Sequence, residues 1–147
     1  MSDLKTKELP SIESSHCVKH LKRHLGRIGF GGEDQRLKEV CQDQIEAYFK
    51  GQRRTFSVPL IMIGTPFQKR VWQSLLNIPY GQTATYSQLA AWMGNPRASR
   101  AVAAACKANP LPIFFPCHRV IGKQGLTGYS SGLPWKQYLL SLEGACW

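Results

Sequence analysis

Apolar residues recur at helical spacing in five stretches of the chain, and turn-forming residues separate these stretches. The spacing predicts amphipathic helices over about 34–50, 66–76, 86–93, 98–108 and 135–142. Gly51 follows the first as a C-terminal stop, while Thr65 and Thr85 precede the second and third as N-cap candidates. The apolar and β-branched run 56–63 predicts a strand despite its proline.

Glycine and proline mark the connections between these elements. Gly94-Asn95-Pro96 predicts a tight turn, so 86–108 has the pattern of a helix-turn-helix. Residues 122–132 hold four glycines and predict a loop, and residues 1–15 predict a loose polar arm. The helix over 98–108 is rich in alanine, so its bare face could approach the backbone or minor groove of DNA closely. Tight packing inside the protein fits the same residues, and the pattern favours neither interpretation.

Charge is distributed unevenly, although the formal net charge is +10. Acids and bases balance over residues 1–46, whereas residues 47–147 hold 11 bases and a single acid, Glu143. A field of one sign favours a polyanionic partner, of which nucleic acid is the commonest. A membrane surface would attract the same charges, and a basic protein without such a partner has the same composition.

The sequence also limits where the protein works. No apolar run approaches the ~18 residues of a membrane span, and the first residues carry acids instead of an apolar signal. We therefore expect no membrane association and a reducing compartment, the cytoplasm or, in a eukaryote, the nucleus. Five cysteines without a C-x-x-C pair indicate free thiols. His16, His20 and His24 share a helical stripe that could bind zinc, but we favour a solvated basic helix face.

PCHRV at 116–120 places a cysteine beside a histidine. A free cysteine holds little thiolate at neutral pH, so Cys117 needs a base, which His118 can be, and a cation such as Arg119 favours the anion. The histidine in turn needs an orienting acceptor, usually a carboxylate. Within residues 47–147 only Glu143 can supply it. A core cysteine beside a structural histidine is the commoner explanation of such a pair, and the pair alone does not exclude it.

Five motifs in order carry a family resemblance: GTPFQKRVW at 64–72, IPYGQTATYSQLA at 78–90, GNPRASRAV at 94–102, ANPLPIFFPCHRV at 108–120 and LLSLEG at 139–144. They resemble the O6-alkylguanine-DNA alkyltransferases, the methylated-DNA–protein-cysteine methyltransferases, over about residues 62–145. The resemblance implies repair of double-stranded DNA that contains O6-alkylguanine. The alkyl group would pass irreversibly to Cys117, without metal or cofactor, so each molecule would react once.

The resemblance also implies roles for single residues. Cys117 would be the nucleophile, and His118 would take its proton through a water oriented with Glu143. Tyr86 would protonate or hydrogen-bond guanine N3, and Asn109 would brace the turn that holds the Cys-His segment.

For DNA binding, the resemblance implies that Arg100 enters the base stack in place of a flipped nucleotide. The small-residue helix would lie in the minor groove, with contacts from Ala98, Ser99, Ala101, Ala105 and Tyr86. The substrate pocket would be formed by Tyr129, Ser130 and Ser131 of the active-site loop together with Val120.

The expected fold class is α/β (α+β). It comprises an N-terminal subdomain over 1–60 and a mainly helical domain over 61–147 with a winged helix-turn-helix-like motif. Relatives usually carry a small antiparallel sheet in the N-terminal domain. Residues 43–60 resemble the end of that domain, but 1–30 do not match its strands, so we expect a reduced or missing sheet. We expect a monomer and leave cooperative loading along DNA open.

Two other function classes compete with repair. A non-catalytic, lesion-sensing DNA-binding protein would bind alkylguanine and leave it intact; the related non-enzymatic subfamily replaces the nucleophile, whereas this sequence keeps Cys117. A thiol hydrolase would use the same cysteine but turn over repeatedly.

Overall fold

The computed structural model of the chain describes residues 35–58, 62–126 and 132–147. Three predictions fall outside these ranges: the zinc site of His16, His20 and His24, the active-site loop of Tyr129, Ser130 and Ser131, and the form of residues 1–34. Within the described ranges no helix has the length and apolar character needed to cross a membrane.

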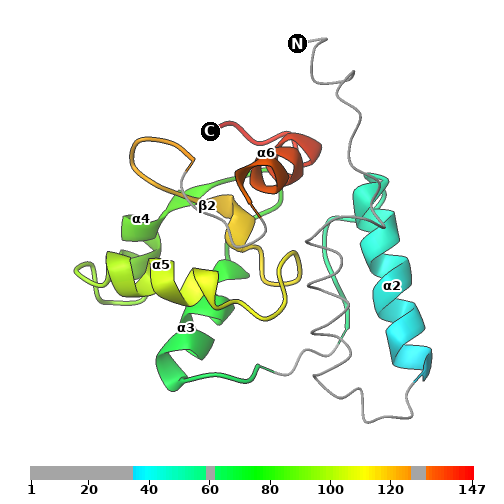
Figure 1. Cartoon of the computed structure of the whole chain (residues 1–147), viewed down its shortest axis with the longest axis horizontal. Helices are drawn as coiled ribbons and strands as arrows, with labels where there is room; N and C mark the ends of the chain where they lie inside the picture. The colour runs from blue at the N-terminus through cyan, green and yellow to red at the C-terminus, as the bar shows by residue number, and fades with distance from the viewer. Residues whose placement is uncertain (1–34, 59–61, 127–131) are drawn as a thin grey trace.

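Helices dominate the described part of the chain (Figure 1). In order, the elements are α2 (Gln35–Phe49), α3 (Pro66–Leu75), β1 (Ala84–Thr85), α4 (Tyr86–Trp92), α5 (Ser99–Lys107), the 3-10 turn η3 (Cys117–Arg119), β2 (Val120–Ile121) and α6 (Leu133–Leu142). β1 and β2 pair in parallel, with Ala84 opposite Val120. This mixture of helices and a small sheet agrees with the predicted α+β class.

Local signals place the helix starts where the sequence predicted them. Thr65 and Thr85 both form capping boxes: each hydroxyl accepts from the backbone N–H three residues on, and that residue's glutamine side chain accepts from the threonine N–H. At the other end of α4, Gly94 has a φ of 83°, a left-handed conformation that closes the tight turn into α5. The adjacent helices α4 and α5 pack against each other and form the predicted helix-turn-helix.

The predicted strand over 56–63 is wrong for its described residues, 56–58 and 62–63, which form no strand. Phe56 packs its ring on Phe114, with 4.7 Å between ring centroids, and Ser57 exchanges hydrogen bonds with the Gln44 side chain of α2. These contacts tie the segment to α2 and to the core instead of to a sheet. Pro59, which has no N–H, could not have donated to a strand partner.

The hydrophobic core continues from α2 into the rest of the molecule. Cys41, Ile45, Tyr48 and Phe49 of α2 belong to the same buried cluster as the apolar faces of α3, α4, α5 and α6. In Figure 1, α2 lies on the opposite side of the molecule from α4 and α5. The division between 1–60 and 61–147 stays a prediction.

Some apolar positions of the predicted stripes face solvent. Val40 of α2 and Leu76 after α3 are exposed, because they lie at the edge of their stripes, while Val71, Trp72 and Leu75 fill the core.

Candidate active site and DNA-binding face

The segment that carries the Cys-His pair is buried along its whole length, from Leu111 to Val120. Asn109 holds its bend: the side-chain amide donates to the carbonyl of Phe115 at 2.8 Å, and the amide oxygen accepts from the N–H of Leu111 at 2.9 Å. The structure thus gives Asn109 the bracing geometry that the resemblance implied. Pro116 then leads into η3, which begins at Cys117.

Ile113 adds strain to this bend. Its φ of 78° lies in the left-handed region, where a β-branched side chain is an outlier that costs about 1–3 kcal/mol. Ile113 is also fully buried in the core. Packing and the Asn109 bonds therefore hold a backbone conformation that the local sequence disfavours, immediately before the cysteine.

Glu143, which caps the C-terminus of α6, gathers four neighbours around one buried carboxylate. Oε2 accepts from His118 Nε2 at 2.7 Å and from the Tyr48 hydroxyl at 2.6 Å. Arg119 donates from Nε to Oε1 at 2.8 Å and from Nη2 to Oε2 at 3.1 Å, and the backbone N–H of Gly81 donates to Oε1 at 3.2 Å. We call Tyr48, His118, Arg119 and Glu143 the Glu143 cluster.

The cluster gives Arg119 two fixed acceptors. Its guanidinium binds Glu143 and the carbonyl of Ile78, and its expected effect on a thiolate at Cys117 stays a prediction. His118 and Glu143, in contrast, meet as the elimination argument required.

The hydrogen bonds define the protonation of His118. Burial alone would raise the pKa of Glu143, but the hydrogen bonds and charges of His118 and Arg119 outweigh it and hold this pKa well below its ordinary range. Burial lowers the pKa of His118 despite the opposing effect of Glu143. A neutral imidazole that donates from Nε2 to a carboxylate carries its lone pair on Nδ1. Nδ1 has no hydrogen-bond partner among the described protein groups, so it is free to act as a base.

Lys136 brings a second buried cation to the site. It is fully buried on α6, its Nζ donates to the carbonyl of Val120 at 2.5 Å, and it lies 5.8 Å from the ring centroid of Tyr86. Burial lowers the pKa of Lys136, while the thiols of Cys117 and Cys106 act in the opposite direction. This ammonium group therefore contributes positive potential next to Cys117.

The other buried cysteines are less suited to act as nucleophiles. Burial raises the pKa values of the Cys41 and Cys106 thiols, and the neighbouring Cys117 raises that of Cys106 further, which outweighs the opposing charge of Lys136. Each therefore stays a thiol, which is a poor nucleophile. Cys117 combines proximity to His118 with the nearby ammonium group of Lys136.

Helix α5 has two different faces. Val102, Ala105 and Cys106 are buried, whereas Arg100, Ala101, Ala104 and Lys107 are exposed. We call these four exposed residues the α5 outer face. Ala105, predicted to contact DNA, is 3% exposed, and its carbonyl accepts from the indole N–H of Trp72. That prediction is wrong in this structure, because Ala105 packs in the core.

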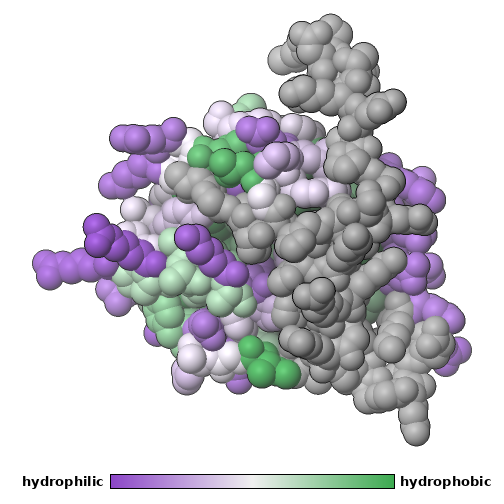
Figure 2. Space-filling view, viewed as in Figure 1, coloured by the Kyte–Doolittle hydropathy of each residue, from purple (hydrophilic) through white to green (hydrophobic). Residues whose placement is uncertain are grey.

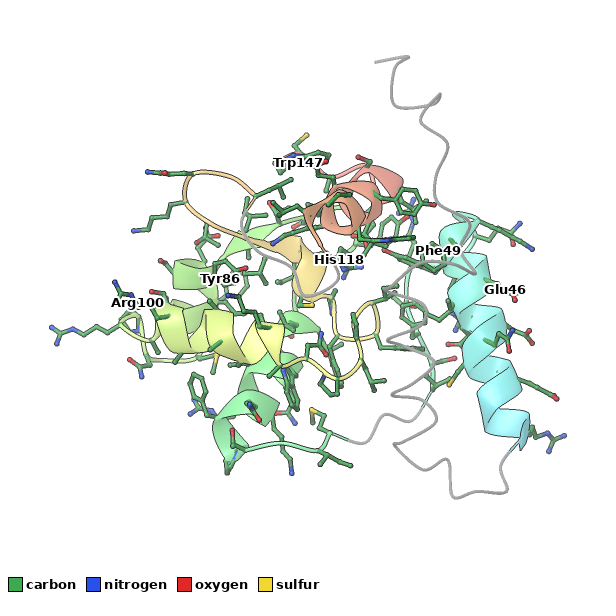
Figure 3. The ribbon with its side chains drawn as sticks, in the orientation of Figure 1. Glu46, Phe49, Tyr86, Arg100, His118 and Trp147 are labelled. Atoms are coloured by element: carbon green, nitrogen blue, oxygen red, sulfur yellow. The ribbon has the colours of Figure 1, made fainter. Side chains whose placement is uncertain are left out.

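An open pocket of about 330 Å³ lies beside this face. The residues around it come from the starts of α4 and α5 and from the turn after β2: Thr85, Tyr86, Ser87, Ser99, Arg100, Ala103, Gly122 and Lys123. Arg100 lies at the start of α5, at the edge of the molecule (Figure 3). In the space-filling view, hydrophilic side chains project from the same side (Figure 2).

Comparison with known proteins identifies the family. Residues 66–145 match the model described as the DNA binding domain of 6-O-methylguanine DNA methyltransferase. The chain is 52% identical over 115 residues to a methylated-DNA–protein-cysteine methyltransferase of Methanosarcina acetivorans, covering 78% of this chain and 74% of that protein. It is 53% identical over 113 residues to the constitutive enzyme of that name in Bacillus subtilis, covering 76% and 68%.

The chain belongs to the 6-O-methylguanine DNA methyltransferase family. Among solved structures it resembles the O6-methylguanine methyltransferase of Mycobacterium tuberculosis, with a TM-score of 0.69 and 50% identity. That match covers 72% of this chain but 65% of the other, less than two thirds of its length. The structure of the M. tuberculosis protein in complex with DNA matches with a TM-score of 0.71 and 48% identity, covering 72% of this chain and 66% of the other.

Sequence reasoning missed two buried residues beside the site in this chain, Lys136 and Tyr48. Lys136 and Glu143 lie two helical turns apart on one face of α6, and a lysine on the apolar face of a helix was the available signal. Tyr48 offered no comparable signal. It fitted the apolar stripe of α2, and only the fold brings its hydroxyl to Glu143.

Proposed function

We propose that this chain repairs DNA by transferring the alkyl group of O6-alkylguanine to the sulfur of Cys117. The observation that carries the proposal is the buried chain of contacts in which Glu143 binds Nε2 of His118 beside Cys117. Family membership and the helix-turn-helix next to this site support the same function. Because its substrate is DNA, we expect the protein in the cytoplasm, or in the nucleus if the source is a eukaryote.

In the reaction, Nδ1 of His118 takes the thiol proton of Cys117, directly or through one water molecule. The sulfur then attacks the alkyl carbon, the S–C bond forms, and the electron pair of the breaking C–O bond stays on the guanine. Tyr86 gives its hydroxyl proton to guanine N3, so the base leaves neutral, and the proton held by His118 passes through solvent to the Tyr86 oxygen. The thioether has no ready route of hydrolysis, so one molecule transfers one alkyl group.

The α5 outer face supports the DNA-binding half of the proposal. The target oxygen cannot be reached inside a duplex, so the nucleotide must leave the stack at a cost of a few kcal/mol. We assign Arg100 to the vacated position, since its side chain is long, charged and exposed. Ala98, Ser99 and Ala101 would line the minor groove. Tyr129, Ser130, Ser131 and Val120 stay proposed pocket residues.

A transfer assay tests this function. Incubation with duplex DNA that contains O6-methylguanine should add one methyl mass to the peptide that holds Cys117. The Cys117→Ser variant should acquire none, and Cys146→Ser, which changes an exposed cysteine, should react like the wild type. The endpoint should be one methyl group per protein molecule.

Two outcomes would contradict the proposal. Tight binding of the lesion with the base intact would favour a lesion-sensing protein. More than one product molecule per protein molecule would favour a hydrolase.

A further inference from the structure

Tyr48 reaches the site from α2, which precedes the residues that match the DNA-binding-domain model, 66–145. Its hydroxyl is 2.6 Å from Oε2 of Glu143, the same oxygen that accepts from His118 Nε2 at 2.7 Å. The tyrosine and the histidine therefore share one acceptor atom.

The position of Tyr48 is fixed from several sides. Its side chain is fully buried, and its ring lies 5.6 Å from that of Phe49, 5.7 Å from Phe56 and 6.2 Å from Tyr80, between centroids. Burial and the charge of Glu143 both raise the pKa of Tyr48, so the hydroxyl keeps its proton and donates. α2 thus presents a rigid donor to the carboxylate.

A carboxylate that accepts more hydrogen bonds is more stable in its charged form, so it attracts a further proton less strongly. Oε2 accepts from Tyr48 and His118, and from Arg119 Nη2 at the longer distance of 3.1 Å. Without the tyrosine hydroxyl, more of the Oε2 charge would act on His118. The tyrosine therefore both orients the carboxylate and limits how strongly it attracts a proton on the imidazole.

We propose that Tyr48 is a positioning residue for alkyl transfer, which acts through Glu143 to keep His118 neutral and correctly oriented beside Cys117. The inference rests on the proposed function. It also gives α2 a role in the reaction in addition to its role in the core.

The pH dependence of transfer separates this role from simple packing. Among the described residues, the charged or titratable groups around His118 are Cys117 and Arg119 of its own turn and Glu143 and Lys136 of α6. Tyr48 of α2 and Tyr80 face it through Glu143. Arg119 and Lys136 oppose protonation of His118, whereas Glu143 favours it. Transfer needs the neutral imidazole, so its rate falls on the acid side as His118 gains a proton. Loss of the Tyr48 hydroxyl strengthens the Glu143 effect and moves this fall to higher pH.

The test compares Tyr48→Phe with Tyr80→Phe. Tyr80 belongs to the same aromatic group, but its hydroxyl donates to the carbonyl of Leu142 at 3.3 Å and not to the carboxylate. Single-turnover rates on an O6-methylguanine duplex are measured between about pH 5 and 9. In Tyr48→Phe the acid limb should move up by about half to one pH unit, with a roughly three- to tenfold loss of rate on that limb. In Tyr80→Phe the limb should stay in place.

A second measurement keeps the proposal testable if Tyr48→Phe folds poorly. Fluorotyrosine at position 48 keeps the shape and makes the hydroxyl a stronger donor, so the acid limb should move to lower pH. The role of Tyr48 would be overturned if the acid limb of the rate profile stayed at its wild-type pH in both Tyr48 variants. It would also be overturned if Tyr80→Phe moved the acid limb as far as Tyr48→Phe does. A wild-type protein that transfers no methyl group would instead overturn the proposed function.

Discussion

Arg119 and Arg100 belong to the same basic part of the chain, but the fold places them in opposite environments. Arg119 is buried, with a carboxylate and a backbone carbonyl as its fixed acceptors. Arg100 is exposed on the α5 outer face, at the edge of the molecule (Figure 3). A buried arginine fixes the geometry of its partners, whereas an exposed one is available to a polyanion. Burial, which composition alone does not reveal, therefore divides the bases into a buried structural group and an exposed group that is available to DNA.

The Glu143 cluster, which holds Arg119, and the α5 outer face, which holds Arg100, should differ in how they respond to mutation and to salt. In the Glu143 cluster, removal of one group leaves other buried groups without partners, so stability and chemistry fall together. On the α5 outer face, removal of one group leaves only solvated neighbours, so DNA binding falls while the fold persists. Salt should strongly weaken DNA binding by the α5 outer face, because that binding joins exposed charges. It should weaken the buried ion pairs of the Glu143 cluster much less.

Glu143→Gln should have the largest effect. It keeps the size of the side chain but removes the charge that balances Arg119 and orients His118. We expect a loss of about 3–5 kcal/mol in the free energy of unfolding, as for other broken buried ion pairs. The rate of transfer should fall by about 100-fold or more. Urea denaturation and single-turnover methyl transfer measure the two losses.

Glu46→Gln is the matched control, because Glu46 is an exposed carboxylate on α2 (Figure 3). It should leave the free energy of unfolding within about 0.5 kcal/mol of the wild type and the rate of transfer within about twofold. If Glu143→Gln kept wild-type stability, the buried cluster would contribute nothing to the free energy of unfolding. The contrast between the Glu143 cluster and the α5 outer face would then be wrong.

Arg100→Ala should have an intermediate effect, confined to duplex DNA. Without the inserted side chain, the unstacked state loses support of a few kcal/mol at most, so transfer from a duplex should fall about 10- to 100-fold. Transfer from free O6-alkylguanine and the free energy of unfolding should not change. Rates on both substrates and a urea titration check these expectations.

Lys107→Ala provides the control, since it removes a cation from the other end of the same face. It should weaken affinity and flatten the salt dependence without a selective loss on duplex DNA. Equal losses on both substrates in Arg100→Ala would place Arg100 in the chemistry of the site instead.

Thr85→Ala and Thr65→Ala should have the smallest effects. Each removes a capping box of the same kind, so each should lower the free energy of unfolding by about 1 kcal/mol. Thr85 precedes Tyr86 and borders the pocket, whereas Thr65 precedes α3 outside the residues that line it. Thermal denaturation and the duplex assay should therefore show similar stability losses and a few-fold loss of transfer in Thr85→Ala alone. Equal transfer rates in both variants would show that the cap does not position Tyr86.

Local signals explain why most elements were predictable. Thr65, Thr85 and Gly94 determine ends and turns through contacts within a few residues, which a sequence displays directly. The pairing of His118 with Glu143 was also predictable, because composition left no other carboxylate. The conformation of 56–63 was not predictable from local signals, because a strand needs a distant partner. Its apolar pattern predicted a strand, but Phe56 and Ser57 pack against Phe114 and Gln44 instead.

The missed features share a tertiary origin. Ala105 and Ala101 look alike in sequence, and only the packing of α5 against α3 buries the first and exposes the second. The Tyr48 hydroxyl meets a carboxylate from the far end of the chain. Arg119 of the short turn η3 binds Glu143 of α6 and the carbonyl of Ile78, both distant in sequence. Side-chain direction on short irregular segments follows from packing, which pattern analysis does not include.

The burial of Glu143 has a consequence for the charge that the protein presents to DNA. It is the single acidic side chain among residues 47–147, and it is enclosed and neutralised inside the protein. The charged side chains of this part that stay exposed are therefore all lysines and arginines, which attract phosphate. We expect the non-specific affinity for DNA to fall steeply with salt, because no exposed carboxylate of this part opposes it.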